Sequence, residues 1–502
     1  MKKYLIGLDN GGTSVKAAVF DLDGRLLAKA GQFTENITPK PGYVERDMEK
    51  LWRANCSCVK TAVEKSGVSP GDVAGIAVCG HGKGLYGWGR NEEPAYHGIS
   101  STDGRAWKYP LKWKEEEVWQ EIYPQICQEL MACQQVSLLA WLKEHEPKVY
   151  EDIRWVFSVK DYIRYRLTGE AYSEMTDVSG SGLMDIRRAE FDEEMLVKLG
   201  IGEVYGKLAP VRCSCDLCGT LTAKAAALTG LMEGTPVAGG MFDIDACAIA
   251  SDIVSPDNIC TIAGTWSINE YISRTPVTDG SAAMNSLYAI PGYYLIEECS
   301  ATSSGNLEWF AGQCMRDLVS EKDGAVYSAV NKMVSDIRAD ECEVYFLPFL
   351  YGSNAHPLGK GSFVGLTTYH TRAHLLRAVF EGVAYSHKKH IDRLLASRDT
   401  PKAVRMAGGA VKSRVWVQMF ADVLGMPVET VEADELGALG CAMAAAVAAG
   451  IYADYTEAAR NMVHINEKIL PVSGHTAIYE KKYQNYLAIQ DALDGIWDRF
   501  EV

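Results

Sequence analysis

The stretch from residue 4 to residue 24 (YLIGLDNGGTSVKAAVFDLDG) constrains the fold more than any other part of the sequence. Two apolar runs, residues 4–8 and 15–20, flank the polar turn DNGGTS. Asn-Gly between apolar runs is typical of a β-hairpin, because both residues tolerate positive φ. A second turn at residues 21–24 lets residues 26–29 return as a third strand. The pattern therefore predicts an antiparallel meander at the start of the chain.

This hairpin has two interpretations. It could be an ordinary surface meander, or its turn could bind an anion. Main-chain N–H groups around Gly12, Thr13 and Ser14 could surround a phosphate. Asp9, at the end of the buried strand, could hold a Mg²⁺ ion. Together these features suit the phosphate tail of a nucleotide.

Composition restricts the possible partners. The 502 residues are 47% hydrophobic and 23% charged, which predicts two or three globular domains. A formal net charge of −15 argues against nucleic acid or an anionic membrane as the main partner. We found no secretory leader or membrane-spanning run, and we therefore expect a cytoplasmic protein. The 14 cysteines are expected to be reduced, and Cys213, Cys215 and Cys218 lack the fourth ligand of a usual zinc site.

Polar residues follow two further short strands. Residues 73–79 (VAGIAVC) end in Gly-His81-Gly-Lys83-Gly, at the kind of strand terminus where α/β sheets bind ligands. Asp103 and Arg105 lie in the polar turn SSTDGR and could contact sugar hydroxyls. The alternatives are an ordinary glycine-rich turn and a surface ion pair. Residues 173–185, rich in Ser, Asp and Gly, are expected to form a loop at the rim of a pocket.

Asp243 begins a small-residue helix directly after a strand and two glycines. It could cap the helix, or it could act as a general base beside a bound hydroxyl. Asp245 is the rival for the second role. Two residues correspond to about 200° around a helix, so both carboxylates cannot face the same hydroxyl. We favour Asp243, because it directly follows the strand and the glycines.

The second half of the chain repeats the opening pattern. The strand ICTIA at 259–263 ends in Gly264-Thr265, a turn chemically similar to the first one. This repetition suggests two related domains with a boundary near residues 248–258. A later strand ends in Gly408-Gly409, and Ser413 is placed to cap the next helix. The Ala- and Gly-rich helix at 436–449 could pack closely on a neighbour or beside a ligand.

Several spaced motifs together resemble the FGGY carbohydrate kinase family, from residue 4 to about residue 450. The most specific is GSFVGL at 361–366, followed after seven residues by HLLRAVFE at 374–381. Independent agreement comes from GLDNGGTSVK (7–16), KDYIRYRLTGE (160–170), GTPVAGG (234–240) and MAGGAVKSRVWVQMFADVLGMPV (406–428). One position departs from the family pattern, because Leu138 replaces the usual Lys three residues before Trp141.

The resemblance implies an α/β fold of two related actin-like, ribonuclease H-like ATPase domains with an interdomain cleft. Residues 1–250 would bind the sugar and contain the phosphate hairpin, and residues 251–502 would bind ATP. Asp243 would be the catalytic base. His81, Lys83, Asp103 and Arg105 would contact the sugar together with Asp243. ATP would be bound by Gly12, Thr13, Ser14, Gly264, Thr265, Gly408, Gly409 and Ser413, with Asp9 positioning Mg²⁺.

Within the family, the sequence resembles the L-xylulose kinase branch. This resemblance rests on GHGKGL (80–85), SSTDGRA (100–106), VSLLAWLKEHEP (136–147), ATSSGNLEWF (301–310) and FLPFLYGSNA (346–355). It implies phosphorylation of L-xylulose at O5 and a homodimer. The alternatives are kinases for D-xylulose, L-ribulose, erythritol or a keto-acid sugar, because few side chains separate such substrates. A non-catalytic sugar sensor on the same fold is the alternative of another class.

Overall fold

The computed structural model describes residues 3–280, 282, 284–316, 325–354, 356, 358–431 and 434–500. The chain forms two compact units. Unit 1 comprises Met1–Val254, Ile272–Ile296 and Ala433–Val463, and unit 2 comprises Ser255–Tyr271, Glu297–Glu432 and His464–Val502. Each unit is therefore discontinuous in sequence. The predicted domain boundary near residues 248–258 stays a prediction.

The main sheet of unit 1 is built on the opening hairpin. Strands β1 (Tyr4–Asn10), β2 (Ser14–Asp21) and β3 (Leu26–Phe33) are consecutive and antiparallel. The predicted meander is thus confirmed. Its first strand runs further than expected, because Asn10 pairs with Val15 and only residues 11–14 lie between these paired positions. The full order is β13-β14-β5-β1-β2-β3, and β15 also pairs with β5. The added strands are β5 (Val73–Gly80), β13 (Leu217–Thr220), β14 (Pro236–Ala238) and β15 (Met241–Phe242).

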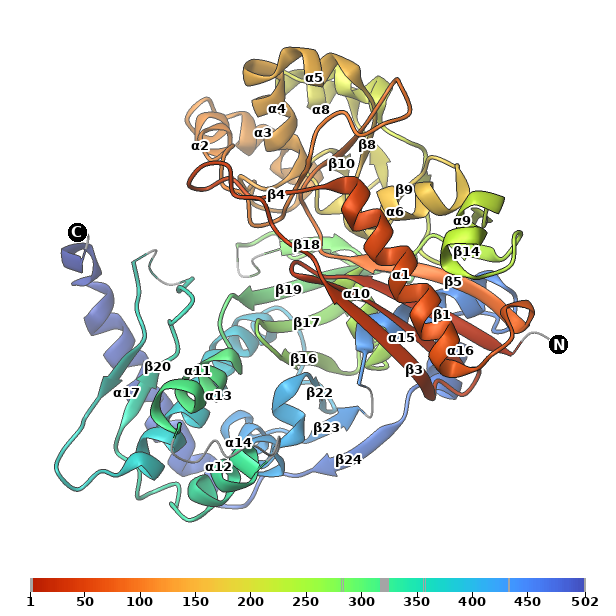
Figure 1. The fold of residues 1–502 in the computed structure, drawn as a ribbon. Helices are drawn as coiled ribbons and strands as arrows, with labels where there is room; N and C mark the ends of the chain where they lie inside the picture. The colour runs from red at the N-terminus through yellow and green to blue at the C-terminus, as the bar shows by residue number, and fades with distance from the viewer. Residues whose placement is uncertain are drawn as a thin grey trace. The chain divides into compact units, whose positions relative to one another are not determined.

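Three helices cover this sheet and form the site's scaffold. Helix α1 (Met48–Ser66) packs against β2 and β3 (Figure 1). Asp47 caps it by accepting a hydrogen bond from the Lys50 N–H. Helix α15 (Leu436–Ala448) packs against β1 and β5, and also against α10 (Asp243–Ala250).

Helix α15 approaches its neighbours so closely that only glycine fits at the contacts. A Cβ atom at Gly7 of β1 would overlap the carbonyl of Ala438, and one at Gly440 would overlap the carbonyl of Ala246 in α10. A Cβ at Gly437 would lie 3.2 Å from Oδ2 of Asp9. The predicted close packing of the small-residue helix is therefore confirmed.

The remainder of unit 1 consists of short elements, several of which pack around a second apolar cluster that includes Trp113 and Trp141. Its helices are α2 (Lys108–Glu115), α3 (Val118–Ile126), α4 (Gln135–His145), α5 (Pro147–Asp152), α6 (Val159–Thr168), α7 (Met175–Ser179), α8 (Glu193–Lys198), α9 (Ala223–Thr229) and α16 (Tyr455–Met462). Its strands are β4 (Glu45–Arg46), β6 (Tyr86–Gly89), β7 (Gly98–Ile99), β8 (Ile153–Phe157), β9 (Ser173–Glu174), β10 (Met184–Asp185), β11 (Glu190–Phe191), β12 (Val211–Arg212) and β18 (Met284–Leu287).

One expectation for this region is wrong. Residues 173–185 do not form an exposed loop at a rim, but the strand β9, the helix α7 and the strand β10. Apart from Gly180, every residue of this stretch is buried. Its polar side chains, which suggested a loop, instead make buried hydrogen bonds and ion pairs, both within the stretch and with α6 and β15.

Most of the second large sheet belongs to unit 2, and its order is β18-β19-β17-β16-β22-β23-β24. Its other strands are β16 (Ile259–Ala263), β17 (Ser267–Ser273), β19 (Tyr294–Ser300), β22 (Val404–Ala407), β23 (Val428–Val431) and β24 (Ile465–Ile469). The helices of unit 2 are α11 (Gly305–Cys314), α12 (Ala325–Ser335), α13 (Arg372–Leu395), α14 (Arg414–Leu424) and α17 (His475–Asp494). A small sheet joins β20 (Tyr345–Leu347) to β21 (Ser362–Val364).

Two further structural facts bear on the sequence-based expectations. In the described part of the chain, helices that combine enough length with enough apolar character to cross a bilayer are absent. All 14 cysteines are free thiols. Among the described residues, Cys213, Cys215 and Cys218 do not form a group placed to hold a metal ion.

The glycine contacts of α15 predict that replacing glycine with alanine lowers stability in this helix but not at a glycine with open space around it. Gly440→Ala should lower the free energy of unfolding by about 1–3 kcal/mol, because the new methyl group meets the Ala246 main chain. Gly312→Ala in α11 is the matched control. That position has open space around it, so alanine should be neutral or raise stability by up to about 1 kcal/mol. Denaturant unfolding of both variants makes the comparison, and equal effects would contradict the packing described.

Candidate active site

Three parallel strands of unit 1 end at the same edge of the sheet. β1 and β5 are parallel with Asn10 opposite Gly80, and β5 and β15 are parallel with Gly80 opposite Phe242. The segments that follow these strands are the hairpin turn, the His81 loop and the helix beginning at Asp243. Carboxyl ends of parallel strands are where α/β sheets bind ligands. The register therefore brings three separately predicted segments of the sequence together.

The hairpin turn is held by an arginine that sequence reasoning missed. Arg46 is buried, and its Nη2 donates to the carbonyls of Gly11 and Gly12 and to the hydroxyl of Thr34. Because the guanidinium binds two carbonyl groups of the turn, it holds the main chain of the turn in one conformation. Thr13 at its tip is exposed, while Gly12 and Ser14 are partly exposed. The role of this turn in phosphate binding stays a prediction, and no sequence motif pointed to Arg46.

Asp9 lies near the end of β1, and its carboxylate is enclosed by β5 and α15. The Cys79 thiol donates to Oδ1 at 3.6 Å. Burial raises the pKa of Asp9, and the nearby Lys16 ammonium opposes this effect. A bound cation would stabilise the charged form of this buried carboxylate. Mg²⁺ is often held by one protein carboxylate together with substrate phosphates. The donor set therefore fits the predicted role in magnesium binding.

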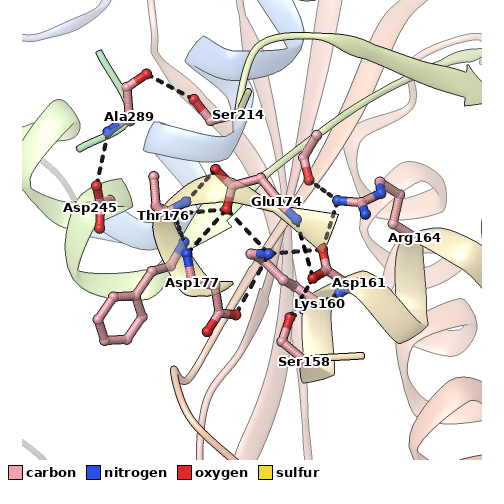
Figure 2. A network of polar contacts seen from close by, with 12 residues as sticks. Ser158, Lys160, Asp161, Arg164, Glu174, Thr176, Asp177, Ser214, Asp245 and Ala289 are labelled. Carbon is pink, nitrogen blue, oxygen red and sulfur yellow. Dashed lines mark hydrogen bonds and ion pairs between the residues drawn. The ribbon is translucent and has the colours of Figure 1, made fainter. Parts of the chain in front are cut away.

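The two candidate bases lie in different environments on the same helix. α10 begins at Asp243, so Asp243 and Asp245 point in different directions, as predicted. Asp245 is fully buried, and its Oδ1 accepts a hydrogen bond from the Ala289 N–H at 3.0 Å (Figure 2). Asp243 is partly exposed at the sheet edge. Asp245 thus has a structural role, and its partly exposed neighbour keeps the candidate role of base.

The His81 loop lies beside Asp243. The His81 N–H donates to the Asn10 carbonyl at 3.0 Å, and Nε2 lies 3.1 Å from the Tyr86 hydroxyl. Burial and the Arg46 guanidinium lower the pKa of His81 to about 3, so its ring is neutral at pH 7. The Lys83 ammonium lies 6.0 Å from the centroid of the Phe242 ring. Lys83 therefore places a charged group near Phe242, the residue that precedes α10.

Asp103 and Arg105 form an ion pair, but it is buried rather than on the surface. Arg105 donates from Nη2 to Asp103 at 2.8 Å and to Glu45 at 2.7 Å. Its guanidinium also lies 4.2 Å from the centroid of the Tyr43 ring. Both charged side chains are fully buried, so the surface-pair alternative is wrong. Their predicted contact with sugar stays a prediction, and the structure shows that Arg105 connects the turn after β7 to Glu45 in β4.

Unit 2 brings its own two predicted loops together. Gly264 and Thr265 form the turn between β16 and β17, and Gly408 follows β22. Gly408 has φ 93°, and a Cβ there would lie 2.8 Å from the Ala263 carbonyl and 3.0 Å from the Gly264 N. Gly408-Gly409 and Gly264-Thr265 are therefore in direct contact. Ser413 caps α14 as predicted, and its hydroxyl donates to Asn331 at 2.6 Å.

His387 supports the Gly264 turn and was not singled out from the sequence. Its Nε2 lies 2.8 Å from the Ser303 hydroxyl, and its Nδ1 lies 2.9 Å from Asn269 Oδ1. The Ser303 N–H donates to the Thr265 carbonyl, so the contact continues to the turn itself. Burial lowers the pKa of His387 to about 3 and keeps it neutral.

A buried ion network lies next to the strand that precedes Asp243. Lys160 is fully buried, and its Nζ is 2.9 Å from Asp161, 3.2 Å from Glu174 and 3.6 Å from Asp177 (Figure 2). Burial alone would lower the pKa of Lys160, but these carboxylates raise it above its ordinary value. Burial raises the pKa of Asp177 to about 7, although Lys160 opposes this effect. Sequence reasoning noted KDY at 160–162 only as part of a motif.

The raised pKa of Asp177 predicts a pH-dependent stability. Between about pH 4 and pH 7 the folded protein holds a proton on Asp177 that the unfolded chain releases, so stability from this group falls as pH rises. Asp177→Asn cannot ionise. Its free energy of unfolding relative to the wild type should therefore increase by about 1–3 kcal/mol from pH 5 to pH 8. Denaturant unfolding at both pH values measures this, with the exposed Asp336→Asn as control. An unchanged difference would contradict the assignment.

Comparison with known proteins identifies the family. Residues 4–250 match the FGGY family of carbohydrate kinases, N-terminal domain, and residues 259–449 match its C-terminal domain. The chain is 37% identical over 504 residues to the L-xylulose/3-keto-L-gulonate kinase of Escherichia coli K12, covering 100% of this chain and 99% of that protein. It is 35% identical to a probable L-xylulose kinase of Pasteurella multocida Pm70, covering 98% and 99%.

A solved structure shares the fold. The crystal structure of xylulose kinase from Rhodospirillum rubrum aligns with a TM-score of 0.86 at 26% identity, covering 99% of this chain and 100% of that one. The predicted α/β, actin-like ATPase fold class is thereby confirmed. The two family domains together span most of the sequence. The chain belongs to the FGGY family of carbohydrate kinases and is an ATP-dependent sugar phosphotransferase.

Proposed function

We propose that the protein transfers the γ-phosphate of ATP to O5 of L-xylulose. The observation that carries this proposal is the common edge of β1, β5 and β15, which gathers Asp9, the His81 loop and Asp243. The choice of sugar is supported by the names of the two relatives at 37% and 35% identity. The first of those names also includes 3-keto-L-gulonate, a keto-acid sugar, which becomes an arm of the test.

Asp243 is proposed as the general base. A sugar hydroxyl is too weak an acid to be ionised at pH 7, so its proton leaves as the new bond forms. The O5 lone pair attacks the γ-phosphorus, the bond from phosphorus to the β,γ-bridging oxygen breaks, and ADP leaves with that electron pair. The O5 proton passes to the Asp243 carboxylate. Phosphoryl transfer has a loose transition state, so positioning and charge neutralisation contribute most of the rate.

The phosphate and nucleotide contacts are proposed for loops in each unit. In unit 1, Gly12, Thr13 and Ser14 would surround the γ-phosphate, and Asp9 would hold Mg²⁺, which neutralises phosphate charge when bound. In unit 2, Gly264 and Thr265 would bind phosphate oxygens, and Gly408, Gly409 and Ser413 would border the adenosine. The contact between the two glycine loops supports this assignment.

The sugar contacts are proposed for the edge beside Asp243. Lys83 is partly exposed there and offers ammonium donors to sugar oxygens. His81 is neutral and can only serve as a hydrogen-bonding or packing group. Asp103 and Arg105 already bind one another, so their part in sugar binding would be to shape the site.

A panel of sugars tests the proposed substrate. In an ADP-coupled assay with Mg²⁺, L-xylulose should show a kcat/KM at least about 10-fold above D-xylulose, L-ribulose, erythritol and 3-keto-L-gulonate. A higher kcat/KM for another sugar would reassign the substrate but retain the kinase. If every sugar bound without stimulating ADP formation, the protein would act as a sensor and the proposal would be wrong.

The proposed base is tested by an isosteric pair. Asp243→Asn should lower kcat by about 10³-fold or more while ATP binding persists, because the amide cannot accept the hydroxyl proton. The matched variant is Asp245→Asn, two residues along the same helix. It should lower the melting temperature through the Ala289 contact and retain kcat within about 10-fold. The reverse pattern in steady-state kinetics would assign the base to Asp245.

A further inference from the structure

The segment that leads to Asp243 is held at both ends by the buried ion network around Lys160. At its start, Arg164 Nη1 donates to the Gly239 carbonyl at 2.6 Å. At its end, the Phe242 N–H donates to the Thr176 hydroxyl at 2.8 Å. Asp243 is the next residue and the first of α10. The main chain on the amino side of the proposed base is therefore tied to side chains from α6 and α7.

The hydroxyl of Thr176 is oriented by Glu174. It lies 2.8 Å from Glu174 Oε2, and a carboxylate can only accept. The single hydroxyl proton must therefore point to Glu174, which leaves the oxygen lone pairs for the Phe242 N–H. Glu174 also accepts from the Thr176 N–H at 3.0 Å and caps α7. These two contacts fix both the main chain and the side chain of Thr176.

Lys160 in turn holds Glu174. Its ammonium contacts Glu174 and Asp161, and Asp161 also binds Arg164 at 2.8 Å. The contacts thus run from Gly239 through Arg164, Asp161, Lys160, Glu174 and Thr176 to Phe242 (Figure 2). Every side chain in this circuit is almost fully buried. A closed circuit of charge-assisted contacts resists displacement better than one isolated hydrogen bond.

We infer that Thr176, oriented by Glu174 and Lys160, is a positioning residue for Asp243. This inference rests on the proposed role of Asp243 as the base. Loss of the Thr176 hydroxyl would free the Phe242 N–H and let the first turn of α10 shift, while the Asp245–Ala289 contact keeps the helix in place. A displacement of the base by about 1 Å can reduce the rate by about 100-fold.

The test compares three threonine variants. Thr176→Val removes the hydroxyl with little change in shape, and should lower kcat by about 10–100-fold while the KM values for sugar and ATP change less than about 3-fold. Thr176→Ser retains the hydroxyl and should restore kcat to within about 3-fold. Thr229→Val in α9 is the matched control, because Thr229 is equally buried and donates only within its own helix. It should lower the melting temperature without lowering kcat.

A double-mutant cycle separates this inference from the proposal on which it rests. If Thr176 acts through Asp243, Thr176→Val should cause no further loss of kcat in the Asp243→Asn background. If the single variant Asp243→Asn is inactive and the single variant Thr176→Val is fully active, Thr176 does not position Asp243, and Asp243 remains the proposed base. An active Asp243→Asn would overturn the base itself. If Thr176→Val does not fold, Glu174→Gln supplies the second variant. Its amide can donate to the hydroxyl and disturb its orientation, so unchanged kcat there would contradict the inference.

Discussion

The close contact of helix α15 with β1 and α10 is the constraint on which the site in unit 1 depends. Gly7, Gly437 and Gly440 lie where a side chain would meet the main chain or the Asp9 carboxylate. β1 carries Asp9 and α10 begins with Asp243, so one small-residue helix supports the elements of both carboxylates. The packing explains why a segment from residues 436–448 belongs to unit 1. It also explains the run of alanine and glycine in that helix.

Buried charge is the second organising feature of unit 1. Lys160 and Arg164 face the carboxylates of Asp161, Glu174 and Asp177 in an environment closed to solvent. Desolvation makes such groups poor sources of net stability compared with apolar packing. Their advantage is geometric, because each charged contact has a narrow range of distances and directions. We interpret the network as a device that sets the course of the main chain from Gly239 to Phe242.

The features predicted from sequence were those with local signals. The opening hairpin, the Ser413 cap and the start of α10 at Asp243 depend on neighbouring residues and were found as expected. The relation of Asp9, the His81 loop and Asp243 depends on strand register across more than 200 residues. Sequence suggested each segment, and the family resemblance joined them, but only the parallel pairing shows their common edge.

The features that were missed depend on distant partners. Arg46 meets the hairpin turn 34 residues away, and Thr176 meets Phe242 66 residues away. The polar stretch at 173–185 was read as a loop because hydrogen-bonding residues are usually exposed, whereas its partners are supplied by α6 and β15. A surface ion pair between Asp103 and Arg105 was an alternative for the same reason. Glu45 and Tyr43, which contact Arg105, are distant in sequence and could not be identified as its partners.

The central claim is that this protein forms a phosphate ester at O5 of L-xylulose. ³¹P NMR of a reaction containing the protein, ATP, Mg²⁺ and L-xylulose tests it directly. The account predicts equal growth of ADP and of one phosphomonoester signal, coupled to the two protons on C5. Inorganic phosphate as the sole product, or a phosphomonoester coupled to the protons of C1, would contradict it.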